Sequence, residues 1–246
     1  MDSTYVQQYA KLEREHWWFI VRQKILLQFL RKNLPASTSS LTILNIGAAG
    51  GASSEWLKTL GTVVSVENDP AFLGQLQRNG ITVTAASVTD LPFAPGSFDL
   101  VCAFDVVEHV EDELRALGEM KRVCRKGGHI CLSVPAMPGL WSQHDVVNGH
   151  FRRYTRGSLI ASVASMGGLT LIDSRYFNSL LFVPIWMARK VSGLFRKKHT
   201  GSDFSYFKTA NWANKLLGAI FGLEHGVFRN TSFSRGVSLA AIFKKI

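Results

Sequence analysis

The chain has 246 residues, which suits one elaborated α/β domain better than two separate domains. Hydrophobic residues make up 46% of it and charged residues 19%, a balance that excludes a mainly disordered chain. Its three cysteines form no CxxC pair, so neither a disulfide framework nor a cysteine zinc site is expected, and the thiols should be buried and reduced.

The formal net charge of +10 comes from the last third of the chain. Residues 1–150 hold 13 basic and 15 acidic side chains, whereas residues 151–246 hold 15 basic and 3 acidic ones. Such a basic region can attract an anionic substrate, a membrane surface or nucleic acid, or can simply keep the protein soluble. Charged residues interrupt the N-terminus before any apolar run, so we expect no secretory signal and a cytoplasmic protein.

Residues 5–33 contain no Gly or Pro and place apolar residues at helical spacing, which predicts one or two helices. Pro35 and the polar run at 36–40 end that segment. Short apolar runs then alternate with helical stretches, which is typical of a parallel sheet with helices on both faces. The expected strands are 41–46, 62–67, 81–85, 98–104 and 129–134, and the expected helices between them are 52–60, 71–78 and 111–124.

A polar loop at 142–155 follows, and its length indicates a functional segment. The apolar stretch Leu180–Ala188 is about half of the ~20 residues that a membrane-spanning helix needs, so we expect no membrane span. The apolar and basic segment 177–198 can contact a membrane surface, form a dimer face or cover an apolar pocket, and we favour the pocket. The remaining expected elements are a helix at 158–166, a strand at 169–177, helices at 179–198 and 209–223, and a strand at 237–243.

The first predicted strand ends in LNIGAAGGAS, which places Gly47, Gly50 and Gly51 in a turn that enters a helix. Glycines let the backbone approach a ligand, and the amides of a helix N-terminus bind polar or anionic atoms. Glu67 ends the second strand, where a carboxylate can accept hydrogen bonds from both ribose hydroxyls of an adenosine-containing cofactor. A turn that only packs tightly is the alternative, but turn and acid together favour nucleotide recognition. NAD is disfavoured because the turn lacks two glycines of the pattern G-x-G-x-x-G.

Longer segments carry a resemblance to a known family. The turn LNIGAAGG, the strand end VVSVEND, the stretch DLPFAPGSFDLVCAFDVVEHV and the segment KRVCRKGGHICLSVPA follow one another in the chain. Together they resemble the class I S-adenosylmethionine-dependent methyltransferases, especially the bacterial group akin to quinone-biosynthesis enzymes (methyltransferase type 11). The resemblance implies a Rossmann-like, doubly wound, seven-stranded and mostly parallel sheet with a helical insertion near the C-terminus. It divides the domain into an N-terminal helical lid and linker at 1–40, a cofactor-binding core at 41–135, and acceptor elements at 136–246.

The same resemblance implies S-adenosylmethionine as the cofactor and S-adenosylhomocysteine as its product. The cofactor-binding residues that it implies are Gly47, Ala48, Ala49, Gly51, Glu67, Asn68, Ser87, Val88, Phe104, Asp105 and Arg22. Asn45 stands where the family usually has Asp or Glu, Ala49 replaces the middle glycine, and Ser87 replaces an adenine-binding Asp. Each is compatible with binding, since Asn and Ser keep hydrogen-bonding groups and Ala adds one methyl group. Together they keep open a non-catalytic cofactor-binding or regulatory module.

Methyl transfer from a sulfonium is an in-line displacement, so the protein mainly positions the acceptor and excludes water. A base is needed only for a protonated acceptor. The predicted catalytic residues are His144, His109 and Asp145, with His144 first because it follows the fifth strand beside Asp145, which can orient it. A structural role for His109 is an equal alternative. His144, Asp145 and His150 could also ligate a metal, but they lack a characteristic spacing, so no metal site is predicted.

The acceptor is expected to be a small aromatic or hydrophobic molecule that is methylated on O or N. Its expected binding residues are Trp17, Trp18, His150, Arg152 and Tyr154. The tryptophans belong to a HWWF cluster that would lie over the cleft as a lid, with core packing as its alternative, and a salt-bridged loop is the alternative for Arg153 and Tyr154. RNA methylation is disfavoured because the chain has no appended RNA-binding motif and no N/D-P-P-Y/F tetrapeptide.

Overall fold

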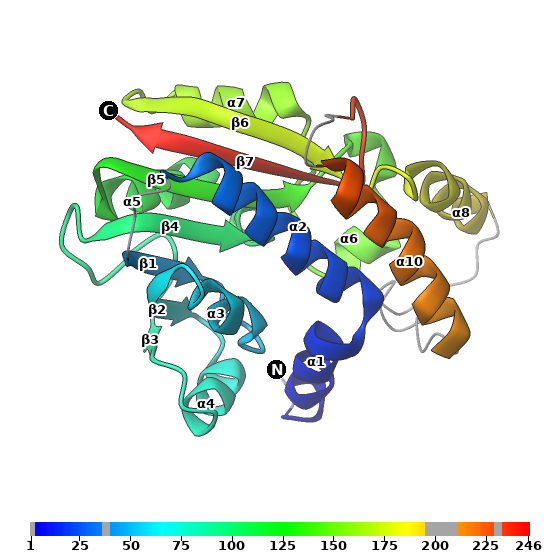
Figure 1. The fold of residues 1–246 in the computed structure, drawn as a ribbon, viewed down its shortest axis with the longest axis horizontal. Helices are drawn as coiled ribbons and strands as arrows, with labels where there is room; N and C mark the ends of the chain where they lie inside the picture. Colours follow the sequence, from blue (N-terminus) through cyan, green and yellow to red (C-terminus); the bar gives the residue numbers. More distant parts are fainter. Residues whose placement is uncertain (1–2, 36–39, 195–210, 229–232) are drawn as a thin grey trace.

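The computed structural model describes residues 3–35, 40–194, 211–228 and 233–246 (Figure 1). Seven strands form one sheet, with the bounds β1 Leu41–Ile46, β2 Gly61–Glu67, β3 Val83–Ala85, β4 Phe98–Phe104, β5 Cys124–Pro135, β6 Leu169–Phe177 and β7 Ser238–Lys245. Their spatial order is β3-β2-β1-β4-β5-β7-β6. The pairs among β1 to β5 are parallel, whereas β7 runs antiparallel to both β5 and β6. The predicted doubly wound, mostly parallel sheet is confirmed.

Helices cover both faces of this sheet. The longer ones are α1 Ser3–Glu15, α2 Trp17–Asn33, α4 Pro70–Arg78, α5 Glu113–Val123, α7 Arg156–Ala164, α8 Phe182–Leu194 and α10 Asn211–Phe228. The shorter ones are α3 Ala52–Leu57, α6 Gln143–Val147, η1 Val107–His109 and η2 Pro138–Leu140. Helices α2 and α10 pack together on one face, and α5 and α7 lie behind the other (Figure 1).

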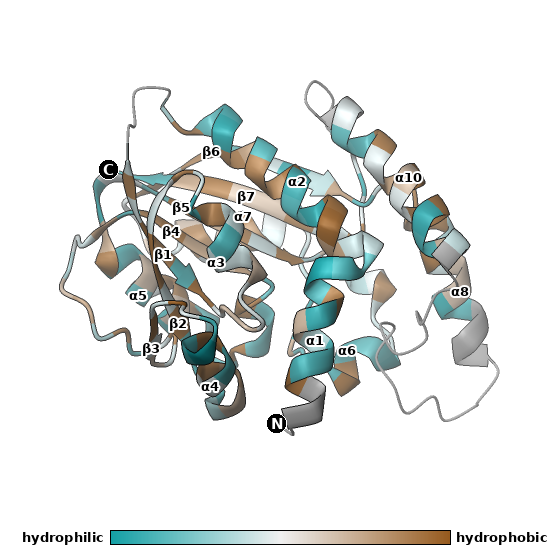
Figure 2. Cartoon of the chain, turned by 60° about the horizontal axis from the view of Figure 1, so that its bottom comes forward, coloured by the Kyte–Doolittle hydropathy of each residue, from teal (hydrophilic) through white to brown (hydrophobic). Residues whose placement is uncertain are grey.

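The alternation of side chains along the strands divides the core into two layers. Leu44 and Ile46 of β1 belong to the layer formed with α5 and α7, whereas Leu41 and Ile43 belong to the layer formed with α2 and α10. Successive residues of a strand face opposite sides, so a strand covered on both faces is apolar throughout. Figure 2 shows this arrangement as largely hydrophobic strands between helices that carry hydrophilic positions.

The N-terminal segment forms two helices that meet at His16. Its Nδ1 accepts a hydrogen bond from the Trp18 amide at 3.3 Å and so caps α2. Further along α2, Ile25, Leu26 and Leu30 are completely buried against the sheet. Because these three residues belong to the main core, α2 is a structural element of the domain, and only α1 and the first two turns of α2 lie over the cavity described below.

Two predicted bounds differ from the structure for identifiable reasons. The segment 142–155, expected to be a loop, contains α6, whose capping box joins Ser142 and Asp145. Strand β5 begins at Cys124, five residues earlier than expected, because Cys124 pairs with Phe98 across a β-bulge that the local pattern does not reveal.

Other expectations concern the ends of the helical insertion and the cysteines. Of the expected helices at 179–198 and 209–223, the parts at 195–198 and 209–210 lie outside the described residues. None of the helices in the described part of the chain is long and apolar enough to cross a membrane. The three cysteines are free and buried, as expected: Cys102, Cys124 and Cys131.

Candidate functional site

A cavity of about 1960 Å³ opens at the carboxyl ends of β1, β2 and β4, where doubly wound sheets bind ligands. Residues of α1 and α2 line one side of it, and residues of α6, α8 and α10 line the far side. Four non-glycine residues of the described chain have left-handed φ, and three of them, Ala49, Asp105 and Asn178, line this cavity. Strained backbone of this kind gathers at functional sites, so the cavity is the candidate site.

Most of the residues predicted for the site line this cavity. They are Trp17, Trp18, Arg22, Gly47, Ala49, Glu67, Asn68, Ser87, Val88, Phe104, Asp105, His109, His144 and His150. Five others do not reach its surface, namely Ala48, Gly51, Asp145, Arg152 and Tyr154. The tertiary structure therefore brings together segments that lie far apart in the sequence, and it places five of the predicted residues away from the cavity surface.

The glycine turn is shaped by close contacts on two sides. Gly47 has a φ of 71°, and a Cβ there would lie 2.5 Å from Cγ2 of Val106. Gly51 has a φ of 96°, and a Cβ there would lie 2.5 Å from Cδ1 of Ile81. Ala48 is fully buried in the same small cluster as Ile81. Gly51 and Ala48 thus shape the turn from beneath, since their local contacts point away from the cavity.

The Glu67 carboxylate joins the glycine turn to the end of β2. Its Oε2 accepts a hydrogen bond from the Ala49 amide at 2.8 Å, and its Oε1 accepts from the amides of Asn68 and Asp69 at 2.8 and 2.9 Å. A carboxylate has about four lone-pair sites, so these three bonds leave about one for a ligand. One ribose hydroxyl can donate to the Glu67 carboxylate without rearrangement. A second hydroxyl would have to share a carboxylate lone pair with one of the three backbone amides.

The three departures from the family pattern lie at different depths. Asn45 is fully buried under the turn, where its Nδ2 donates to the hydroxyls of Ser53 and Ser54 at 2.9 and 3.0 Å. It therefore supports the turn and does not line the cavity. Ala49 and Ser87, by contrast, both line the cavity, so their exchange changes the surface that a ligand meets.

An ion pair connects α2 to the ends of β4 and β5. Arg22 Nη2 lies 2.6 Å from Asp105 Oδ2 and donates to the Ser133 hydroxyl at 3.1 Å. The guanidinium also lies over the Trp18 ring, 5.0 Å from its centroid. Arg22 was expected to contact a cofactor directly. In the structure its guanidinium binds Asp105, which makes the arginine a positioning group for that carboxylate.

Aromatic side chains form the wall between the helical cover and the sheet. Trp17 is buried and meets Phe221 of α10 edge to face, with 5.8 Å between the ring centroids. The ring of Phe104, at the end of β4, lies beside the Trp56 ring, with 5.4 Å between the ring centroids. Trp17 therefore packs in the core and lines the cavity at once, so both interpretations of the tryptophan cluster hold in part.

Asp145 is the centre of a buried polar network beneath the cavity. Its Oδ1 accepts hydrogen bonds from His150 Nδ1 at 2.9 Å and from Arg153 Nε at 2.7 Å, and its Oδ2 accepts from the Ser142 amide at 2.9 Å. Burial would raise the pKa of Asp145, but the hydrogen bond from His150 and the charge of Arg153 hold that pKa well below its usual range. We expected this carboxylate to orient His144, but its hydrogen bonds go to His150 and Arg153 instead.

Glu108 and His109 follow β4 in the turn η1. Glu108 is fully buried, and burial together with nearby Asp105 raises its pKa well above the usual range. His109 lines the cavity, and its ring centroid lies 4.7 Å from that of His150. Burial, followed by the neighbouring His150, lowers the pKa of His109. His144 lies on the same side of the cavity, with its ring centroid 6.0 Å from that of His150.

Arg152 and Tyr154 were expected to bind the acceptor, but neither residue lines the cavity. The Tyr154 backbone pairs with Pro135, and alternation along this extended segment turns Arg153 inward and its two neighbours away from the cavity. Tyr154 donates to Glu113 Oε2 at 2.5 Å, and Arg152 donates to the same oxygen at 3.2 Å. The salt-bridged loop that was the alternative is what the structure shows for these residues.

Sequence reasoning missed two buried acidic residues that line the cavity. Glu13 of α1 is buried, and its Oε2 accepts from the Ala52 amide at the start of α3 at 3.3 Å. Its neighbours in the sequence, LEREH, are charged, so the pattern indicates a solvated face. Glu108 directly precedes His109, and the prediction for this turn named only the histidine. The burial of Glu13 and of Glu108 could not be predicted from local spacing, because each side chain is buried by a segment that is distant in the sequence.

Comparison with known proteins agrees with this geometry. Residues 44–132 match the family model described as a methyltransferase domain. Over these residues the chain is similar to methyltransferase domains. A relative from Mycolicibacterium gilvum, named an uncharacterized methyltransferase, is 32% identical over 161 residues, which cover 56% of this chain and 63% of the relative. A demethylmenaquinone methyltransferase from Beutenbergia cavernae is 30% identical over 126 residues, covering 50% and 52%.

A solved structure supports the fold of the methyltransferase domain. The geranyl diphosphate methyltransferase in complex with S-adenosylmethionine has a TM-score of 0.57 at 14% identity, covering 91% of this chain and 85% of its own. The resemblance to methyltransferases is thus confirmed for residues 44–132, and the similarity of the fold extends over most of the chain. The chain spans about half to two thirds of the length of the relatives named here.

Proposed function

We propose that this protein transfers the methyl group of S-adenosylmethionine to an oxygen or nitrogen atom of a small, apolar or aromatic molecule. The size of the cavity carries this proposal. Its volume of about 1960 Å³ is about twice the upper end of the range of roughly 300–1,000 Å³ for a pocket that holds one ligand. The cavity therefore has room for an acceptor beside the cofactor.

The half of the cavity near the glycine turn fits the cofactor. Gly47 leaves the backbone open where a Cβ would meet Val106, and Glu67 keeps about one acceptor site for a ribose hydroxyl. When bound there, S-adenosylmethionine supplies an activated methyl group on a sulfonium. The residues that would hold it are Gly47, Ala49, Glu67, Asn68, Ser87, Val88 and Phe104.

The chain's own residues contribute position and exclusion of water. Asp105 follows Phe104 at the end of β4, and Arg22 and Ser133 hold its carboxylate in one orientation. The Trp18 ring packs against that guanidinium, and both residues line the cavity. A site closed in this way orients two reactants and removes water from the reacting atoms, which is the main demand of an in-line displacement.

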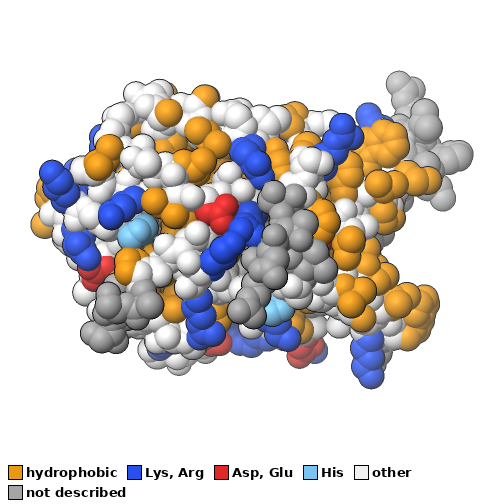
Figure 3. All heavy atoms as spheres, turned by 45° about the horizontal axis from the view of Figure 1, so that its top comes forward, with side chains coloured by type: hydrophobic (Ala, Val, Ile, Leu, Met, Phe, Trp, Pro, Cys, Tyr) orange, Lys and Arg blue, Asp and Glu red, His pale blue; other side chains and the backbone are white. Residues whose placement is uncertain are grey.

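The far half of the cavity supports an apolar acceptor. Pro184, Ile185 and Ala188 of α8 line it together with Leu217 of α10. Hydrophobic side chains also gather on the outside, at the right-hand end of Figure 3 where these helices lie. Trp186 of α8 is one of the exposed large hydrophobic residues of the described chain. A peripheral membrane contact through residues 177–198 is consistent with this surface and stays a prediction.

His144 is our candidate for the base when the acceptor must lose a proton. It lines the cavity on α6, and an imidazole so placed contributes roughly 10²–10⁴-fold to the rate of a proton transfer. We expect His144→Ala to lower turnover at least about 100-fold while S-adenosylhomocysteine affinity is kept. His225→Ala, on the part of α10 that does not line the cavity, is the matched control. Equal turnover of both variants removes His144 from the reaction.

Calorimetry of cofactor binding tests the proposal as a whole. The full chain should bind S-adenosylhomocysteine and not NAD, and Glu67→Ala should weaken that binding by roughly 1.5–3 kcal/mol, the value of a hydrogen bond to a charged acceptor. Glu15→Ala, an exposed acid on α1, should bind as the wild type does. Preferential binding of NAD would refute the proposal. Cofactor binding without transfer of a labelled methyl group to any screened acceptor would favour the regulatory module.

A further inference from the structure

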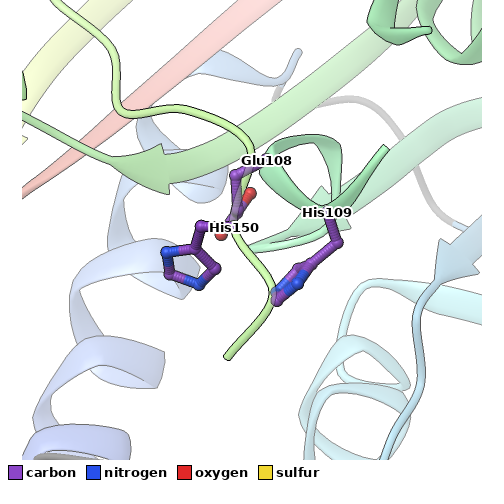
Figure 4. A group of neighbouring side chains, drawn as sticks. All are labelled: Glu108, His109 and His150. Atoms are coloured by element: carbon purple, nitrogen blue, oxygen red, sulfur yellow. The ribbon is translucent and has the colours of Figure 1, made fainter. Parts of the chain in front are cut away.

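Three potential metal ligands meet in the wall of the cavity. Glu108 and His109 come from the turn after β4, and His150 comes from the segment after α6 (Figure 4). One ligating atom from each lies within 4.8 Å of the other two, and all three side chains line the cavity. The two segments are about 40 residues apart in the sequence, so only the fold creates this group.

Glu108 is the unusual member of the group. It is fully buried, and neither of its carboxylate oxygens has a hydrogen-bond partner among the described residues. Buried polar groups are nearly always paired, and a buried carboxylate without a partner is costly. The nearby guanidinium of Arg153 donates instead to Asp145 and to the Ala136 carbonyl. The carboxylate of Glu108 thus faces the two imidazoles without a partner that would explain its burial.

His150 is held as metal-binding histidines usually are. Its Nδ1 lies 2.9 Å from Asp145 Oδ1, so Nδ1 is the nitrogen that donates to the carboxylate and Nε2 is the nitrogen that faces a ligand. The carboxylate behind the ring fixes its orientation and increases its basicity as a ligand. The His109 ring lies beside it, with 4.7 Å between the two ring centroids.

We propose that Glu108, His109 and His150 bind a divalent transition-metal ion of the Zn²⁺ or Co²⁺ type, which in turn holds an ionisable oxygen of the acceptor. Two imidazoles and one carboxylate suit such an ion, and three protein ligands leave a coordination position open for a substrate. Ligand atoms about 2.0–2.2 Å from a tetrahedral ion lie roughly 3.3–3.6 Å apart, so the widest separation in the group, at most 4.8 Å, has to close by up to about 1.5 Å when the ion binds.

The role given to the ion rests on the proposed function, whereas the site itself does not. The ligand group lies between Asp105, at the cofactor end, and α6 on the acceptor side. A bound cation polarises an oxygen and lowers the pKa of a hydroxyl, so an acceptor with a phenolic or enolic oxygen would lose its proton readily. The acceptor class would then be molecules methylated on such an oxygen.

Metal binding to the full chain, without cofactor or acceptor, tests the site. Titration with Co²⁺ should give one equivalent with visible absorption bands of a bound ion, and Zn²⁺ should displace it. Glu108→Gln should lower the Co²⁺ affinity at least tenfold, as should His150→Gln. The glutamine at position 108 is neutral and close in size to the glutamate it replaces, so this variant should fold, and the wild type alone should melt at a higher temperature with Zn²⁺ than without it.

His144→Gln is the matched control because His144 lies in the same cavity but outside the ligand group. It should bind Co²⁺ as the wild type does. The proposal is overturned if the wild type shows no bound-ion absorption, if Glu108→Gln binds equally well, or if His144→Gln loses binding to the same extent. Calorimetry with S-adenosylhomocysteine on the same samples tests the proposed function separately, so a protein that binds cofactor but no metal refutes only the metal site.

Discussion

Glu13 gives a quantitative test of how α1 is held over the glycine turn. Burial raises its pKa from the usual 4.5 to about 7, against hydrogen bonds from the turn and the charges of Arg22 and Arg14. Because the pKa in the folded protein is the higher one, the folded state binds more protons between these two values. As far as Glu13 determines it, the unfolding free energy is therefore highest below pH 4.5, falls as the pH rises toward 7, and is constant at higher pH.

The magnitude follows from the size of this shift. A shift of about 2.5 units at 1.36 kcal/mol per unit corresponds to roughly 3 kcal/mol between the two plateaus. Glu13→Gln keeps an oxygen that can accept from the Ala52 amide and removes the charge. Relative to the wild type, the variant should therefore gain roughly 2–3 kcal/mol in unfolding free energy from pH 5 to pH 8.

Urea unfolding of both proteins at pH 5 and pH 8 measures this difference directly. Taking the difference between variant and wild type cancels the other titrating groups. Glu15→Gln, an exposed acid on the same helix, should stay within about 0.5 kcal/mol of the wild type at both values. A variant-minus-wild-type difference that is the same at pH 5 and pH 8 would show that Glu13 is not buried against the turn in solution.

Other changes have equally specific outcomes. Gly47→Ala should weaken S-adenosylhomocysteine binding in calorimetry, because its Cβ would meet Val106 at 2.5 Å and φ is 71°, and Val106→Ala should restore only part of the loss. Arg22→Met should cost about 2 kcal/mol in urea unfolding by breaking a charged hydrogen bond; an unchanged midpoint contradicts this. Tyr154→Phe should lower stability by about 1 kcal/mol and leave turnover unchanged, since the hydroxyl bonds outside the cavity. Deletion of residues 1–15 should leave a folded protein that binds cofactor more weakly, and equal affinity would show that α1 does not cover the site.

The sheet and the cofactor half of the site could be predicted from the sequence because their signals are local. An apolar run between turn residues defines a buried strand whatever its neighbours are, so β1 and β4 fall at the predicted residues. The carboxyl ends of parallel strands share one edge, which places Gly47, Glu67 and Phe104 in one cavity from their positions in the chain alone.

The acceptor half depended on the tertiary structure, because side-chain direction in an irregular segment is set by its distant partners. Tyr154 turns away from the cavity because its backbone pairs with β5, and Asp145 binds His150 because the segment after α6 returns beneath it. Glu108 becomes a buried carboxylate facing two imidazoles only when that segment closes over it. The sequence alone thus determined which elements form and which strand ends meet at the cavity. Long-range packing decided which side chains meet on its far side, since no local periodicity encodes contacts between segments some 40 residues apart.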